Sequence, residues 1–187
     1  LAIDVYIAVR LMSRKPSSAQ PAPVPEAPQP DAAISRLCFP TGQTNLLTDV
    51  LEEVYQPTAA GRYESALYGS ARNGTRGGRV SAVFHEGIDI APLRRDRNGC
   101  ALDTVHAVAG GTVAYINRVA GNSNYGIYVV LLHDDPVGPV YSLYAHLAAP
   151  EPEFREGQAV LGGERIGKMG ATPASIKSAS ATSRSRW

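Results

Sequence analysis

Short apolar runs separated by turn residues dominate the chain after residue 80. Val, Ile, Tyr and Thr alternate there with Gly, Asn and Asp, a pattern typical of a meandering antiparallel sheet. In residues 139–147 (PVYSLYAHL), every second residue from Tyr141 to Leu147 falls on one face of a strand. Ser142, Tyr144 and His146 fall on the other face. We therefore predict a mainly β domain built on an antiparallel sheet, with His146 facing away from an apolar stripe.

Further strands are predicted on either side of this segment. Residues 124–135 read as a buried strand that is apolar on both faces, and residues 104–119 as a β-hairpin that turns at Gly110 and Gly111. Residues 154–170 read as two short strands separated by a turn at Gly162 and Gly163.

Two segments before residue 80 have a different pattern. Residues 44–56 (TNLLTDVLEEVYQ) place Leu46, Leu47, Val50, Leu51 and Val54 at helical spacing, which predicts a short N-terminal amphipathic helix. The Gly- and Arg-rich residues 69–80 favour a solvated loop, with the rim of a cleft as the alternative.

The first 30 residues differ in composition from the rest. Residues 1–15 are apolar but contain charged residues, and the stretch is shorter than the roughly 20 residues that a membrane span requires. We interpret it as the remnant of a signal sequence or membrane anchor, with a peripheral helix as the alternative. The prolines of residues 16–30 predict an extended linker, so the domain itself is assigned to residues 31–173 and a disordered tail to residues 174–187.

Charge and cysteine content restrict the partners and the compartment. The net charge of +1 gives no overall field that would attract nucleic acid, and only the incomplete N-terminal segment could contact a membrane. Cys38 and Cys100 either form one disulfide, which an exported domain permits, or remain two small apolar side chains. Their spacing is not that of a zinc-binding pair.

Residues 84–92 (FHEGIDIAP) contain the most distinctive polar pattern of the chain. On a strand, His85, Gly87 and Asp89 share one face, and Pro92 with the β-branched isoleucines argues against a helix. A fully extended strand separates residues four apart by about 13 Å, so a shared metal ion requires a bent backbone. Glycine makes such a bend inexpensive, and Gly87 lies midway between the two side chains.

Five segments in this order, HEGID (85–89), VHAVAGGTV, YGIYVVLLHDD, YSLYAHL and REGQAVLGGERIGKMGATP, resemble the lysostaphin-like zinc metallopeptidases that cut peptidoglycan. The resemblance covers about residues 84–173. It implies a mostly antiparallel, half-barrel-like β fold of the duplicated hybrid motif type. It also implies Zn²⁺ as cofactor, His85 and Asp89 as metal ligands, His146 as a catalytic residue beside the metal, and Gly87 and Tyr144 as structural support.

The resemblance stops at the end of the chain. The family has a final strand with an H-x-H pair that supplies the third zinc ligand and a second catalytic histidine, but no histidine follows His146 here. We expect zinc affinity to be weakened or lost in consequence. A frameshift after about residue 175 is our hypothesis for the difference, and translation of the other two frames tests it. His106 is expected to be a solvated or cross-strand residue, and His133 to make a structural hydrogen bond to the adjacent turn at Asp134 and Asp135.

Two functions follow for the sequence. The first is a zinc endopeptidase that cleaves peptide cross-links of bacterial peptidoglycan, truncated and impaired as written. The second is a non-catalytic module that binds peptidoglycan or regulates another hydrolase. Both imply peptidoglycan peptides as partners. Both also imply a location in the bacterial cell envelope, in the periplasm or outside the cell, with tethering to the membrane as an option.

Overall fold

The structure, a computed structural model of the chain, describes residues 34, 36–47, 50–57, 62–76, 79–136 and 138–172. The predicted N-terminal segment, the Pro-rich linker and the C-terminal tail lie outside these residues. No helix within the described ranges is long and apolar enough to cross a membrane.

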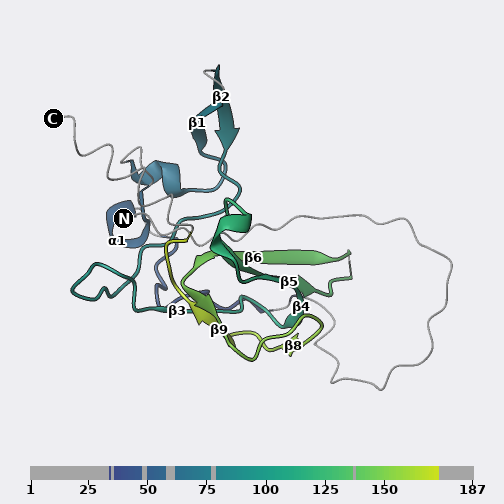
Figure 1. Cartoon of the computed structure of the whole chain (residues 1–187). Helices are drawn as coiled ribbons and strands as arrows, with labels where there is room; N and C mark the ends of the chain where they lie inside the picture. Colours follow the sequence, from purple (N-terminus) through teal and green to yellow (C-terminus); the bar gives the residue numbers. More distant parts are fainter. Residues whose placement is uncertain are drawn as a thin grey trace, which may run out of the picture.

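The described residues are mainly β, as predicted, and their strands pair antiparallel in three sheets with no closed barrel (Figure 1). One sheet is the hairpin β1 (Ala71–Arg76) and β2 (Arg79–Phe84). The second has the order β3 (Thr104–His106), β9 (Arg165–Lys168) and β7 (Ala149–Pro150). The third has the order β6 (Val140–Leu147), β5 (Ile127–His133), β4 (Gly111–Asn117) and β8 (Ala159–Val160).

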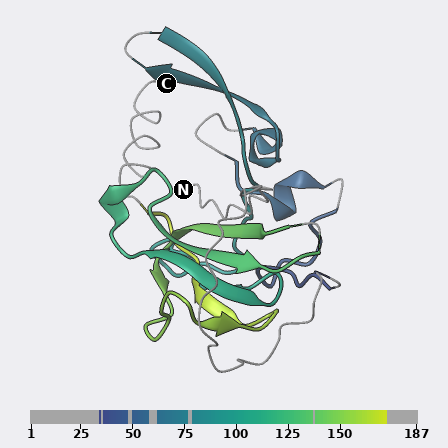
Figure 2. The same cartoon turned by 90° about the vertical axis from the view of Figure 1, so that its right-hand side faces the viewer.

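Three short helical segments accompany the strands: α1 (Leu51–Val54), the 3₁₀ turn η1 (Tyr63–Ala66) and the 3₁₀ turn η2 (Ala120–Asn122). The β1–β2 hairpin projects away from the two larger sheets in both views (Figures 1 and 2). The main core lies between those larger sheets, because it combines Val105 of β3 and Ile166 of β9 with Val113, Val129 and Leu131 of the four-stranded sheet.

The helix predicted over residues 44–56 forms only in part. Regular helix covers Leu51–Val54, while Leu47 is fully exposed and Val50 is 43% exposed. Tyr55 leaves the helix in an extended conformation and forms a β-bridge with Ile90, so tertiary pairing ends the helix. Val54 and Tyr55 pack with Ala66 in a second, smaller core.

The segment 69–80 is not a solvated loop, because it contains β1 and the start of β2, paired from Ala71 with Phe84 to Arg76 with Arg79. The hairpin predicted at Gly110 and Gly111 is also wrong. Strand β3 pairs with β9, whereas β4 pairs with β5 and β8.

Close packing explains one glycine of that predicted turn. A Cβ atom on Gly111 would lie 2.3 Å from the carbonyl oxygen of Leu132, so β4 approaches β5 at a distance that only glycine permits. The predicted pair of strands over 154–170 is confirmed as β8 and β9, with a turn between them at Gly162 and Gly163, where Gly163 has φ +80°.

The faces of β5 and β6 differ from the prediction. In β5, Val129, Leu131 and His133 are buried while the alternate residues are only half-buried, so one face alone is fully covered. In β6 the buried face carries Ser142 and Tyr144, not Tyr141 and Leu143. The register then shifts, because Val129 pairs with Tyr144 and Ile127 pairs with Leu147. The extra residue of this bulge returns Leu147 to the core.

Candidate functional site

The site begins where β2 ends. Regular strand stops at Phe84, and the chain bends at Gly87 before Ile90 joins its bridge with Tyr55. Within this bent segment His85, Gly87 and Asp89 are buried and Glu86 is exposed, so the predicted alternation persists. The polar face points into the protein, since His85 is 2% exposed and Asp89 is 0% exposed.

Backbone hydrogen bonds hold this segment in a cradle formed by η1 and the turn after it. The amide of His85 donates to the carbonyl of Ser70 over 2.9 Å, and the amide of Asp89 donates to the carbonyl of Ala66 over 2.9 Å. The carbonyl of Asp89 in turn accepts from the amide of Gln56 over 2.9 Å. The cradle fixes the bend that brings two side chains four residues apart into contact.

The side chains of His85 and Asp89 meet inside this cradle. Nδ1 of His85 lies 3.0 Å from the carbonyl oxygen of Leu67, and Nε2 lies 3.1 Å from Oδ1 of Asp89. Because a carbonyl oxygen only accepts hydrogen bonds, Nδ1 of the neutral ring carries the proton and Nε2 carries the lone pair. Oδ1 of Asp89 accepts no hydrogen bond from the described residues. Two electron-pair donors therefore face one another in a buried place.

A zinc ion fits between these two donor atoms. Donors about 2.0–2.1 Å from one zinc in tetrahedral geometry lie roughly 3.3 Å apart, close to the observed contact. Imidazole and carboxylate are ordinary zinc ligands, and a backbone carbonyl on the second ring nitrogen is the usual support of a ligating histidine. The described residues bring together no group of three His, Cys, Asp or Glu side chains, so they supply two ligands and no third.

His146 is located at the bulge near the end of β6. It is the non-glycine residue of the described chain with a positive φ, +55°, and its amide donates to the carbonyl of Tyr125 over 2.8 Å. Its Nδ1 lies 2.5 Å from the carbonyl oxygen of Thr172, so the neutral ring again presents a lone pair at Nε2. Such an unusual backbone conformation at a polar residue is typical of functional sites.

Burial lowers the pKa of His146, against opposing effects of the Thr172 carbonyl and the charge of Asp89. Arg72 and His85 also lower the pKa of His146, so both side chains lie within electrostatic range of its ring. The three residues predicted from the sequence thus share one region, with direct contact between His85 and Asp89.

Thr172 holds His146 and the ends of two strands together. Its hydroxyl accepts from the amide of Ile127 over 2.8 Å and donates to the carbonyl of Leu147 over 2.9 Å. Gly126, with φ +65°, lies so close that a Cβ atom there would be 2.2 Å from the Thr172 carbonyl oxygen. The sequence analysis missed this residue, and the small glycine beside it gave no signal of the contact.

Arg72 is the second residue of the candidate site that the sequence analysis missed. Its Nη2 lies 2.5 Å from Oδ2 of Asp89, and its Nε donates to the carbonyl of Ser65 over 3.0 Å. The surrounding glycines and arginines favoured a solvated loop. An arginine 17 residues before Asp89 carries no periodic signal that would place it against that carboxylate.

The remaining histidines have structural partners. His106 lies 2.7 Å from the Thr104 hydroxyl and 3.0 Å from the Gly163 carbonyl. His133 is buried, with Nδ1 2.7 Å from the Gly110 carbonyl and Nε2 2.7 Å from the Ser142 hydroxyl, so it bonds to the core and not to the adjacent turn.

Tyr144 belongs to the same buried hydrogen-bonded group as His133. Its hydroxyl lies 2.9 Å from the Ser142 hydroxyl and accepts from the Val108 amide over 2.8 Å. Burial raises the pKa of Tyr144 to about 12. Tyr144 supports the core beneath β6.

Cys38 and Cys100 are both free thiols.

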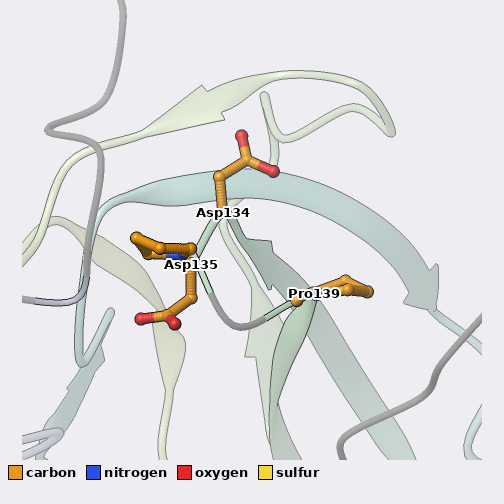
Figure 3. Close-up of a pocket in the computed structure, with 5 residues that line it drawn as sticks. Asp134, Asp135 and Pro139 are labelled. Atoms are coloured by element: carbon orange, nitrogen blue, oxygen red, sulfur yellow. The ribbon is translucent and has the colours of Figure 1, made fainter.

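A pocket lies at the turn between β5 and β6, lined by Asp134, Asp135 and Pro139 among others (Figure 3). The two carboxylates point in different directions there (Figure 3). This turn follows His133, at the opposite end of the hairpin from His146. The pocket contains none of the predicted site residues.

A comparison with protein families supplies the decisive observation. The family described as peptidase family M23 matches residues 83–181, which is more than half of the 187-residue chain and includes His85, Asp89 and His146. The chain belongs to peptidase family M23. No curated protein and no solved structure matches it. At the level of the family, M23 membership indicates a metallopeptidase-type hydrolase acting on peptidoglycan, and the M23 family is generally zinc-dependent.

Proposed function

We propose that this M23 domain binds zinc through His85 and Asp89 and hydrolyses peptide cross-links of peptidoglycan, with activity limited by an incomplete ligand set. The observation that carries the proposal is the buried 3.1 Å approach of Nε2 of His85 to Oδ1 of Asp89, two atoms that both present lone pairs when the imidazole is neutral. A cation placed between them removes the repulsion of two electron pairs.

The residues of the chain have distinct tasks in this reaction. His85 and Asp89 hold the ion, which when bound polarises a carbonyl and lowers the pKa of a water molecule. His146 provides the general base, because burial lowers its pKa and keeps the imidazole neutral near pH 7, able to accept a proton at Nε2. Thr172 orients that ring through Nδ1.

Metal titration of the purified chain tests the proposal. We expect zinc to bind in calorimetry to the wild type, and binding to fall at least tenfold in His85→Ala and in Asp89→Ala. His106→Ala is the matched control, since it removes an imidazole that contacts Thr104 and Gly163 on another sheet. If His85→Ala and Asp89→Ala bind zinc as tightly as the wild type, the assignment of these ligands is wrong.

Hydrolysis is measured separately on purified peptidoglycan sacculi. Catalysis is supported if the wild type releases soluble cross-link fragments, if a chelator abolishes this release, and if His146→Ala releases none. A second candidate function, a non-catalytic peptidoglycan-binding module, is favoured by the lack of a third ligand among the described residues. Binding to sacculi that is unchanged by chelator, without release of fragments, distinguishes this candidate from the enzyme.

The proposed substrate also bears on location. Peptidoglycan lies outside the cytoplasmic membrane, so either function requires an exported protein, retained at the cell envelope or released. Cell fractionation tests this part, and recovery of the full chain from the cytosol alone contradicts it.

A further inference from the structure

Arg72 connects the β1–β2 hairpin to the candidate metal ligands. It lies near the base of β1, where its backbone pairs with Val83 of β2. Its side chain is about one-fifth exposed and its Nη2 approaches Oδ2 of the fully buried Asp89 at 2.5 Å. A charge-assisted bond to a buried carboxylate is among the stronger polar contacts in proteins.

A second anchor fixes the position of the guanidinium. Nε and Nη2 of Arg72 both donate to the carbonyl oxygen of Ser65, over 3.0 and 2.5 Å. Ser65 belongs to η1, the same turn whose Ala66 carbonyl accepts the amide of Asp89. The planar guanidinium therefore contacts the same turn that holds the backbone of Asp89, while it also binds the carboxylate of Asp89.

The two oxygens of Asp89 consequently face different groups. Oδ2 is held by Arg72, and Oδ1 is directed toward Nε2 of His85 at 3.1 Å. Without the guanidinium, the carboxylate could rotate about its Cβ–Cγ bond and lose this arrangement. Hydrogen bonds from outer groups that orient a ligating carboxylate typically change metal affinity by about 10–100-fold.

We propose that Arg72 is the positioning residue of the metal site, which holds Asp89 so that Oδ1 and Nε2 of His85 bind one zinc ion together. The inference rests on the proposed zinc function. The β1–β2 hairpin, which carries Arg72, would then hold the metal site in place in addition to any contact with substrate. The positive charge of Arg72 opposes a bound cation, and we infer that the orientation of Asp89 outweighs this repulsion.

The chemistry of arginine is specific to this role. Its flat guanidinium spans a carbonyl and a carboxylate at the same time, whereas lysine offers a single point charge on a flexible chain. Glutamine lacks the charge but keeps an N–H donor. The series Arg72→Lys, Arg72→Gln and Arg72→Ala therefore separates charge from orientation.

Zinc titration of these variants by calorimetry tests the inference, with circular dichroism to confirm that each is folded. We expect Arg72→Ala to bind zinc at least tenfold more weakly, and Arg72→Gln to recover part of the loss. Arg165→Ala is the matched control, because it removes an arginine paired with the carboxylate of Glu151 at 2.7 Å on the surface of another sheet. We expect zinc affinity to be unchanged in Arg165→Ala.

The outcomes separate this inference from the proposed function. If the wild type binds zinc and Arg72→Ala binds it equally well or more tightly, the positioning role is wrong while the zinc site stands. If the wild type binds no zinc, both fail. In an Asp89→Ala background, Arg72→Ala should add no further loss, because the group that it positions is gone. A further loss there overturns the proposal, as does a folded Arg72→Gln variant with wild-type affinity.

Discussion

Replacement of Gly126 by alanine tests whether Thr172 organises the His146 region. Gly126 is buried with φ +65°, a conformation that costs an alanine about 1–2 kcal/mol. Its new Cβ atom would lie 2.2 Å from the Thr172 carbonyl oxygen. Since real contacts of this kind are not shorter than 3.0 Å, Thr172 must move by at least about 0.8 Å.

The displacement should break the hydrogen bonds that Thr172 makes. Its hydroxyl bonds with the Ile127 amide and the Leu147 carbonyl each contribute about 1 kcal/mol. With the conformational cost, Gly126→Ala should lower the free energy of unfolding by about 3–4 kcal/mol. The His146 ring also loses its fixed partner at Nδ1.

A matched control separates the contact from the backbone conformation. Gly157 has φ +83°, yet nothing lies within 4 Å of a Cβ atom placed on it. Gly157→Ala should therefore cost only the conformational part, about 1–2 kcal/mol. Urea denaturation followed by circular dichroism measures both variants. Equal destabilisation of the two variants would refute the role given to Thr172.

Three further predictions concern stability. His146 is neutral when folded because its pKa is lowered, so the unfolded chain binds more protons below pH 6.5 and stability falls with decreasing pH there. His146→Gln should reduce the slope of the free energy of unfolding against pH by up to about 1.4 kcal/mol per pH unit. Urea titrations at several pH values below 6.5 measure this slope, and an unchanged slope contradicts the prediction. Tyr144→Phe leaves the Val108 amide buried without its acceptor and should cost about 1–3 kcal/mol, whereas a loss near zero in thermal melting argues against that bond. Leu47→Ala should change the free energy of unfolding by less than about 0.5 kcal/mol, because Leu47 is fully exposed. Val54→Ala in the smaller core should lower it by more than about 1 kcal/mol. A comparable loss in both variants would support the longer helix predicted over residues 44–56.

The sequence by itself determined the fold class and the chemistry of the candidate ligands. Alternation of apolar and polar residues depends on the two-residue period of a strand, so it predicted β structure wherever that period is regular. The H-x-G-x-D spacing placed His85 and Asp89 on one face with a bend at Gly87, and both features are present. These properties are local, and local sequence specifies them.

Tertiary structure alone decided what surrounds those residues. Strands β3 and β4 do not pair with one another, because β3 pairs with β9 near the end of the described chain and β4 pairs with β5, the next strand. The bulge in β6 returns Leu147 to the core, since one added residue changes the side on which every later side chain lies. Arg72 and Thr172 reach the site across 17 and 26 residues of sequence from Asp89 and His146. Contacts over such separations leave no periodic pattern in the sequence, because they depend on how the sheets and turns pack and not on the order of neighbouring residues.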